Sequence, residues 1–150
     1  MPIPNLNSEG LLPEGIHQAS IIEIKDKFGN SNKHRAFLMG KLILVLANLC
    51  AAGVVNVWID GSFVTDKEIP GDIDICWEYY PGVNRNILDP VFFRSQKEIK
   101  NKYSLHVFPT GAWAGEDWVS FFQRVRNPVT MKTKGILFVK LNLEDLRSLK

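Results

Sequence analysis

The sequence lacks several features that would assign it to a special class of protein. It contains two cysteines, Cys50 and Cys76, too few for a disulfide framework and typical of reduced, buried thiols. Its first residues show no basic-then-apolar pattern of a signal peptide. Its most apolar run, residues 42–52, spans eleven positions, whereas a membrane span needs about 20. We therefore expect a cytoplasmic protein that makes no membrane contact, with this run as a core helix.

Internal repeats, low-complexity tracts and a large net charge are also missing. The 18 Lys and Arg residues almost balance the 16 Asp and Glu residues, but residues 123–150 carry seven basic against two acidic side chains. Such a basic segment can contact a polyanion such as RNA, or it can be the solvated face of a last strand and helix. Both interpretations stay open at this stage.

The length and composition are those of one globular domain spanning residues 1–150. An apolar fraction of 45% and a charged fraction of 23% are ordinary for a chain that buries a core. Residues 1–16 contain three prolines and no apolar periodicity, so they are expected to form an extended arm over the domain. His17 then belongs to the surface or to the packing of this arm.

Caps and apolar patterns predict a mixed order of helices and strands. Ser20 and Glu23 fit a capping box, Asn32 can cap the next helix, and Asp89-Pro90 reads as a cap followed by a first helical residue. His34 and Arg35, near the start of the second helix, are expected at the surface. The predicted helices cover residues 21–28, 33–52, 90–102, 116–125 and 143–149, and the predicted strands cover residues 54–60, 72–78, 103–108 and 135–141.

Residues 55–80 carry the chemistry that this sequence suggests most strongly. They read as a strand, a Gly61-Ser62 turn, a polar loop, and a second strand with Asp72 and Asp74 on one face. Two adjacent carboxylates can hold Mg²⁺ or Mn²⁺ together with substrate phosphates. The Gly61 N–H and the Ser62 hydroxyl can donate to phosphate oxygens. The alternative is a pair of strand-edge aspartates beside a turn.

Three further features of this region each have two interpretations. Lys67 can reach triphosphate oxygens or be a solvated loop lysine. Asp60 can be a third carboxylate on the metal side, or a hydrogen-bond acceptor that stabilises the turn. The aromatic residues of the helix over 116–125, among them Phe121 beside Arg124, can stack on bases or belong to the core.

Glycine-serine at a strand end, nine further residues, and then Asp-x-Asp between apolar residues resemble the signature of polymerase-β-like nucleotidyltransferases. The segments LPEGIH, DGSFVTDKEIPGDIDICW, and FFQ followed by KGI resemble small stand-alone bacterial members of that superfamily. The resemblance implies an α/β (α+β) fold with a short mixed sheet and helices mainly on one face. It also implies Mg²⁺- or Mn²⁺-dependent transfer of a nucleoside monophosphate from a triphosphate, with ATP expected, to a hydroxyl of RNA, protein or a small molecule.

The same resemblance implies a third carboxylate on a neighbouring strand, and here the sequence departs from it. The strand best placed to supply that residue is YSLHVFP, in which Leu105 and Val107 are expected in the core and Ser104 and His106 on the active face. His106 can be a general base or a packing histidine. The expected catalytic set is therefore Asp72, Asp74 and His106.

The missing acid keeps a second function open. Some relatives form the nucleotidyltransferase half of toxin–antitoxin pairs, so the resemblance also implies a cognate toxin or antitoxin as a protein partner. The chain can then be a catalytically weak or inactive nucleotidyltransferase-like module that binds such a partner.

Overall fold

The computed structural model describes residues 3–124 and 133–149, which fold into a mixed α+β domain around one five-stranded sheet. In chain order its elements are β1 (Ile16–Gln18), α1 (Ile21–Phe28), α2 (Lys33–Ala51), β2 (Asn56–Asp60), the 3₁₀ helix η1 (Ser62–Val64), β3 (Asp74–Glu78), the 3₁₀ helix η2 (Pro90–Phe93), α3 (Gln96–Tyr103), β4 (His106–Thr110), α4 (Trp118–Phe122), β5 (Ile136–Lys140) and α5 (Leu143–Ser148).

The sheet has the order β1-β5-β2-β3-β4 and mixes parallel with antiparallel pairs. The central strand β2 runs antiparallel to both β5 and β3, whereas β3 and β4 run parallel. In this register Asp60 lies opposite Asp74, and Asp74 lies opposite His106. Three polar side chains from three adjacent strands therefore meet at one end of the sheet.

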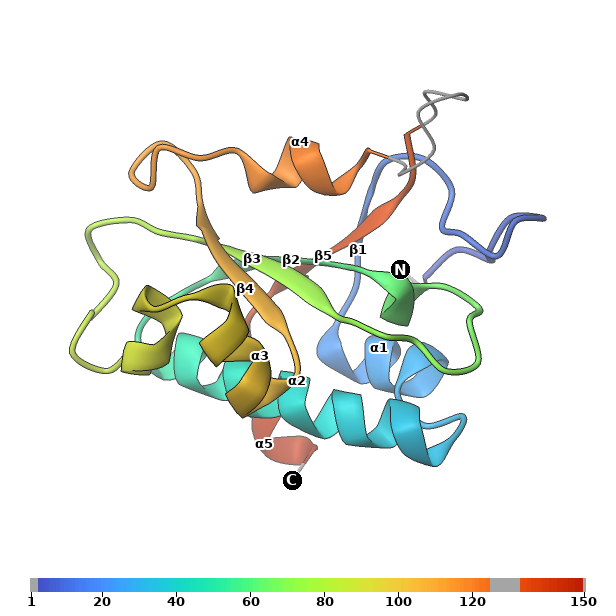
Figure 1. The fold of residues 1–150 in the computed structure, drawn as a ribbon, viewed down its shortest axis with the longest axis horizontal. Helices are drawn as coiled ribbons and strands as arrows, with labels where there is room; N and C mark the ends of the chain where they lie inside the picture. The colour runs from blue at the N-terminus through green and yellow to red at the C-terminus, as the bar shows by residue number, and fades with distance from the viewer. Residues whose placement is uncertain (1–2, 125–132, 150) are drawn as a thin grey trace.

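Helices cover the two faces of the sheet unequally. Figure 1 shows α1, α2, α3 and α5 on one side of the sheet and α4 alone on the other. The main core lies on the side of α2, where Ile59, Ile75 and Trp77 of the sheet are buried. Cys76 points the other way, into a small cluster under α4 with Phe122 and Ile136. The prediction of a mixed sheet with helices mainly on one face is confirmed.

Local sequence signals place the first two helices correctly. The Ser20 hydroxyl accepts from the Glu23 N–H while the Glu23 carboxylate accepts from the Ser20 N–H, which is the expected capping box. The Asn32 side chain caps α2 through the Arg35 N–H. By length and composition α2 is apolar enough to cross a membrane, as buried core helices also can be. Its inner face, including Leu42 and Leu46, lies in the main core.

Some predicted elements differ from the structure. The strand β1 was not predicted; the arm enters the sheet there, parallel to β5. The single helix expected over 90–102 is two helices, because Arg94 is extended and Ser95 caps a new helix. Ser104 is not on the active face of a strand but is the left-handed C-cap of α3. Strand β4 continues through Pro109, which an edge strand tolerates.

The α4 region is shorter than predicted and lies partly outside the described residues. The helix covers Trp118–Phe122 instead of 116–125. The end of the predicted helix at Val125 lies outside the described residues, as does part of the basic segment 123–150. RNA contact by that segment stays a prediction. Both cysteines are free, with Cys76 buried as expected and Cys50 half-buried.

Candidate functional site

The candidate site begins where β2 ends. Asp60 is the last residue of β2, and Gly61 follows with φ of 94°, a conformation that glycine adopts readily and other residues rarely do. A Cβ atom at Gly61 would lie 3.0 Å from the Asp74 N atom and 3.1 Å from the Asp72 carbonyl oxygen. Glycine is therefore required here both for the turn and for the close approach of β3.

Ser62 joins the two ends of the loop that follows. Its N–H and hydroxyl donate to Asp72 Oδ1 at 3.0 and 2.7 Å, and its Oγ accepts from the Gly71 N–H at 3.0 Å. These bonds hold the Asp72 carboxylate beside the Gly-Ser turn. Phosphate binding by Ser62 stays a prediction, and it would require the hydroxyl to exchange Asp72 for a phosphate oxygen.

Asp74 and His106 form the second part of the site. The His106 Nδ1 lies 2.8 Å from Asp74 Oδ1, and the two side chains are 31% and 16% exposed. Leu105 and Val107 on either side of the histidine are buried, so the predicted alternation around His106 is confirmed. The strand next to the acid pair thus presents an imidazole where the resemblance implied a carboxylate.

Asp72, Asp74 and His106 together can hold one divalent cation. Each offers a ligand atom, and these atoms all lie within 4.8 Å of one another. Two carboxylates and one imidazole are a reasonable ligand set for Mn²⁺, whereas Mg²⁺ prefers oxygen ligands throughout. The donor set therefore fits the cation that the sequence suggested, with a shift in preference towards softer ions.

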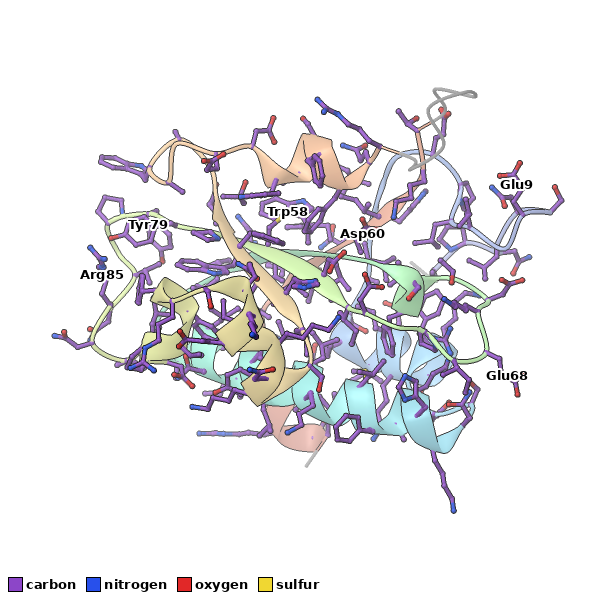
Figure 2. All side chains as sticks on the ribbon, in the orientation of Figure 1. Glu9, Trp58, Asp60, Glu68, Tyr79 and Arg85 are labelled. Atoms are coloured by element: carbon purple, nitrogen blue, oxygen red, sulfur yellow. The ribbon has the colours of Figure 1, made fainter. Side chains whose placement is uncertain are left out.

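Asp60 lies next to this cluster but is not a member of it. Its side chain is almost fully buried and forms an ion pair with Lys134. Burial raises the pKa of Asp60 above its usual value, although the Lys134 ammonium and a hydrogen bond from the Gly61 N–H oppose that rise. Of its two predicted roles, the acceptor that stabilises the turn is the one this geometry favours. Figure 2 shows Asp60 and Trp58 between the sheet and α4.

A cleft of about 490 Å³ lies beside Asp72 and Asp74, and His106 is not part of its lining. Asp60, Gly61, Ser62, Asp72 and Asp74 line one part of it, and the cations Arg124 and Lys134 lie in the same lining. The remaining lining residues are Leu11 of the N-terminal arm, Thr65, Phe121 and Phe122. The cleft thus combines carboxylates for a cation, basic groups for an anion and an aromatic surface.

Lys134 is a site residue that sequence analysis did not single out, whereas Arg124 was noted there beside Phe121. Lys134 opens the KGI segment immediately before β5, so its placement depends on the pairing of β5 with β2. Lys67, which was predicted to bind phosphate, is exposed and does not line this cleft. It lines a separate hollow at the start of α2.

The start of α2 holds the loop that follows the Gly-Ser turn. Arg35 was expected at the surface, but it is 3% exposed and donates to the carbonyl oxygens of Phe63, Thr65 and Lys67 at 2.7, 2.8 and 2.5 Å. The prediction was wrong because backbone carbonyls of a distant loop replace the water around the guanidinium. Two neighbouring side chains also bond to carbonyl oxygens of this loop. The Asn32 amide donates to the Glu68 carbonyl, and His34 Nε2 contacts the Pro70 carbonyl.

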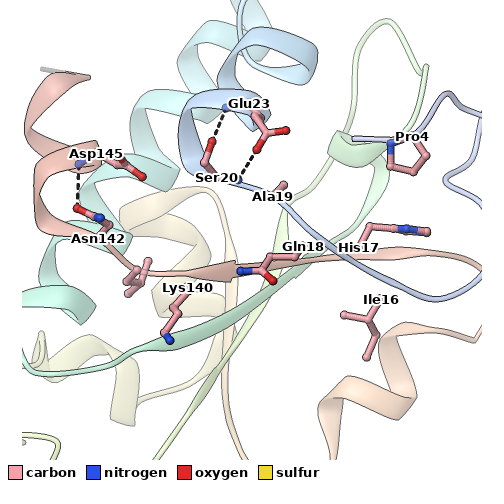
Figure 3. Close-up of a pocket in the computed structure, with 11 residues that line it drawn as sticks. Pro4, Ile16, His17, Gln18, Ala19, Ser20, Glu23, Lys140, Asn142 and Asp145 are labelled. Carbon is pink, nitrogen blue, oxygen red and sulfur yellow. Dashed lines mark hydrogen bonds between the residues drawn. The ribbon is translucent and has the colours of Figure 1, made fainter. Parts of the chain in front are cut away.

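A larger hollow of about 750 Å³ lies elsewhere, between β1, the end of β5 and the starts of α1 and α5 (Figure 3). Three of its polar side chains cap helices: Ser20 and Glu23 form the capping box of α1, and Asn142 caps α5. His17 contacts the Pro13 carbonyl at 2.7 Å, which agrees with arm packing. Lys140 and Asp145 also line this hollow, but its described side chains form no cluster suited to a metal ion.

Comparison with known proteins identifies a family but no characterised relative. Residues 4–140 match the sequence model of DUF6932, a family of unknown function. No curated protein and no solved structure matches the chain.

Proposed function

We propose that this chain, which belongs to the DUF6932 family of unknown function, is a divalent-cation-dependent nucleotidyltransferase. It would transfer a nucleoside monophosphate from a nucleoside triphosphate, with ATP expected, to a hydroxyl group of a protein, an RNA or a small molecule. A polymerase-β-like arrangement of the fold is part of this proposal.

One observation carries the proposal. The ligand atoms of Asp72, Asp74 and His106 lie within 4.8 Å of one another, and both aspartates line a cleft that also contains the Gly61-Ser62 turn. Lys134 and Arg124 bring positive charge to the same cleft. A cation cluster beside basic groups and a glycine turn suits a ligand that carries several phosphates.

In this proposal different residues bind the cation and attract the phosphates. Asp72 and Asp74 would hold the cation, which when bound neutralises phosphate charge and promotes ionisation of the attacking hydroxyl. Lys134, which also pairs with Asp60, would attract the phosphate oxygens. In the transfer, the hydroxyl oxygen of the acceptor bonds to the α-phosphorus, the bond from that phosphorus to its bridging oxygen breaks, and pyrophosphate leaves.

The acceptor proton needs a base, and His106 is the candidate. Its Nδ1 contacts Asp74, so Nε2 is the ring nitrogen left to take the proton of the hydroxyl. The free nitrogen of a neutral imidazole has a lone pair that can accept such a proton. Asp74 would then orient the ring as well as contribute to the cation cluster.

Calorimetric titration with ATP, CTP, GTP and UTP in Mg²⁺ or Mn²⁺ tests the proposal. At least one triphosphate should bind in a cation-dependent manner, and Asp74→Asn should abolish that binding. Asp26→Asn is the matched control, because Asp26 is an exposed carboxylate on α1 outside the cleft. Failure of all four triphosphates to bind the wild-type protein would overturn the proposal.

A second function is favoured by the make-up of the cluster, in which the described residues place no third carboxylate beside Asp72 and Asp74. His106 stands in register with Asp74 where the resemblance implied an acid, and Asp60 is paired with Lys134. Both features fit a catalytically weak module that binds a toxin or antitoxin partner. Neutralisation assays separate the two functions, with the product of the neighbouring gene as the assumed partner. If partner binding alone is the function, the Asp72→Ala, Asp74→Ala double variant should still neutralise that partner. If catalysis is needed, the double variant should lose this effect.

A further inference from the structure

Helix α4 presents two adjacent phenylalanines in different ways. Phe122 is 3% exposed and belongs to the small core between α4 and the sheet, whereas Phe121 is 52% exposed. Both residues line the cleft that contains Asp72 and Asp74. Burial explains Phe122, but it does not explain a large aromatic ring that remains open beside an acidic cluster.

The Phe121 ring is supported by other aromatic residues. Trp118 meets it edge to face, with 5.4 Å between ring centroids and an interplanar angle of 87°. Trp118 in turn stacks on Phe108 of β4, with a centroid distance of 4.1 Å. Edge-to-face and stacked contacts of this kind restrict ring orientation. The exposed ring is therefore held on a chain of contacts that reaches the sheet.

Arg124 adds a second planar group at this position. Its guanidinium carbon lies 5.9 Å from the centroid of the Phe121 ring, and Arg124 lines the same cleft. Arginine and aromatic rings both offer flat faces on which nucleic-acid bases stack. The acids and Lys134, by contrast, offer only groups suited to a cation and phosphates.

We propose that Phe121, with Arg124 beside it, is the platform on which the base of a bound nucleoside triphosphate stacks. This inference rests on the proposed function and specifies its substrate. The cleft volume of about 490 Å³ falls in the usual range for small-molecule sites, about 300–1,000 Å³. Because stacking reads no hydrogen-bond pattern, the site should accept all four bases and bind the larger purines more tightly.

The test compares ATP with sodium tripolyphosphate, which lacks base and ribose, by calorimetry in Mn²⁺. The wild-type protein should bind ATP more tightly, and Phe121→Ala should weaken ATP binding about fivefold or more while leaving tripolyphosphate binding unchanged. Phe121→Tyr should restore ATP binding. Trp113→Ala is the matched control, because Trp113 is 68% exposed but lies outside the cleft lining.

The outcomes separate this inference from the proposed function. Equal binding of ATP and tripolyphosphate by the wild-type protein, or an unchanged ATP affinity in Phe121→Ala, overturns the platform and leaves the proposed function intact. If the wild-type protein binds neither ligand, both proposals fail. Because Phe121 is half exposed, its alanine variant should fold, and thermal unfolding should show a melting temperature close to that of Trp113→Ala.

Discussion

Asp74 and His106 occupy paired positions on the parallel strands β3 and β4, and His106 Nδ1 lies 2.8 Å from Asp74 Oδ1. The pair puts an imidazole where a third carboxylate would give the acid cluster one more negative charge. This single position therefore affects cation preference, basicity and the choice between the two proposed functions.

Replacing His106 by aspartate should change the cation preference of the site. We expect His106→Asp to bind Mg²⁺ about fivefold or more tightly than the wild-type protein, because a further unit charge about 4 Å from a cation contributes on the order of 1 kcal/mol even in water. The wild-type protein should bind Mn²⁺ in preference to Mg²⁺. Calorimetric titration with each metal alone measures both effects, and equal Mg²⁺ affinities in the two proteins would contradict the cluster.

Gly61→Ala should destabilise the domain and disturb the site. A side chain at φ of 94°, with its Cβ about 3 Å from the backbone of β3, should cost about 1–3 kcal/mol. Urea unfolding measures this loss. The matched control is Gly71→Ala in the same loop, where an added Cβ meets nothing within 4 Å. Similar losses in the two variants would show that the Gly61 turn has no special requirement for glycine.

Arg35 should stabilise the loop between the Gly-Ser turn and Asp72. Removing its guanidinium leaves several carbonyl oxygens of the loop without their donor, so Arg35→Ala should lose about 3 kcal/mol or more of unfolding free energy. Arg35→Lys should recover only part of this, because an ammonium group cannot serve so many separated acceptors. In limited proteolysis, the protease should cleave residues 63–71 faster in both variants than in the wild-type protein. An unchanged cleavage rate would contradict stabilisation of this loop by Arg35.

Asp89 should make stability depend on pH. Partial burial raises the pKa of Asp89, but hydrogen bonds from Lys102, Tyr103 and the Val91 N–H outweigh this effect and hold the pKa below its ordinary value. Its stabilisation is therefore present above the unfolded-state pKa and is lost as pH falls through the lower folded-state pKa. Asp89→Asn should cost about 1 kcal/mol at pH 7, the usual contribution of one hydrogen bond.

Urea unfolding of the wild-type protein and Asp89→Asn from neutral to acidic pH checks the Asp89 prediction. The stability difference between the two proteins should shrink towards the acidic end. Asp26→Asn serves as the control, since Asp26 is exposed on α1. A difference that stays constant with pH would show that the charge of Asp89 does not matter.

Features that depend on nearby residues were predictable from the sequence. Helix α1 lies where the capping box of Ser20 and Glu23 placed it, and Asn32 caps α2 as expected. Alternation along one strand also placed Leu105 and Val107 in the core and His106 on the opposite face. Each of these depends on periodicity or hydrogen bonds within a few residues, which the order of side chains specifies directly.

Features that depend on distant segments were missed. Arg35 is polar and near a helix start, so it looked like a surface residue until the loop over 63–67 covered it with carbonyl groups. Strand β1 has only three residues and forms because β5 offers it an edge. Lys134 reaches Asp60 across 74 residues of chain, a pairing with no local signal.

The sequence by itself determined the order of most helices and strands and the Gly61-Ser62 turn, but the strand expected to carry both aspartates begins at Asp74, so Asp72 lies in the loop before it. The order and the turn follow from short-range steric and hydrogen-bonding preferences. Only the tertiary structure decided that His106 lies against Asp74 and that Lys134 forms an ion pair with Asp60. It also decided that Phe121 lines the cleft beside Asp72 and Asp74. Such contacts depend on strand order and register, which are set by how the whole chain buries its apolar surface.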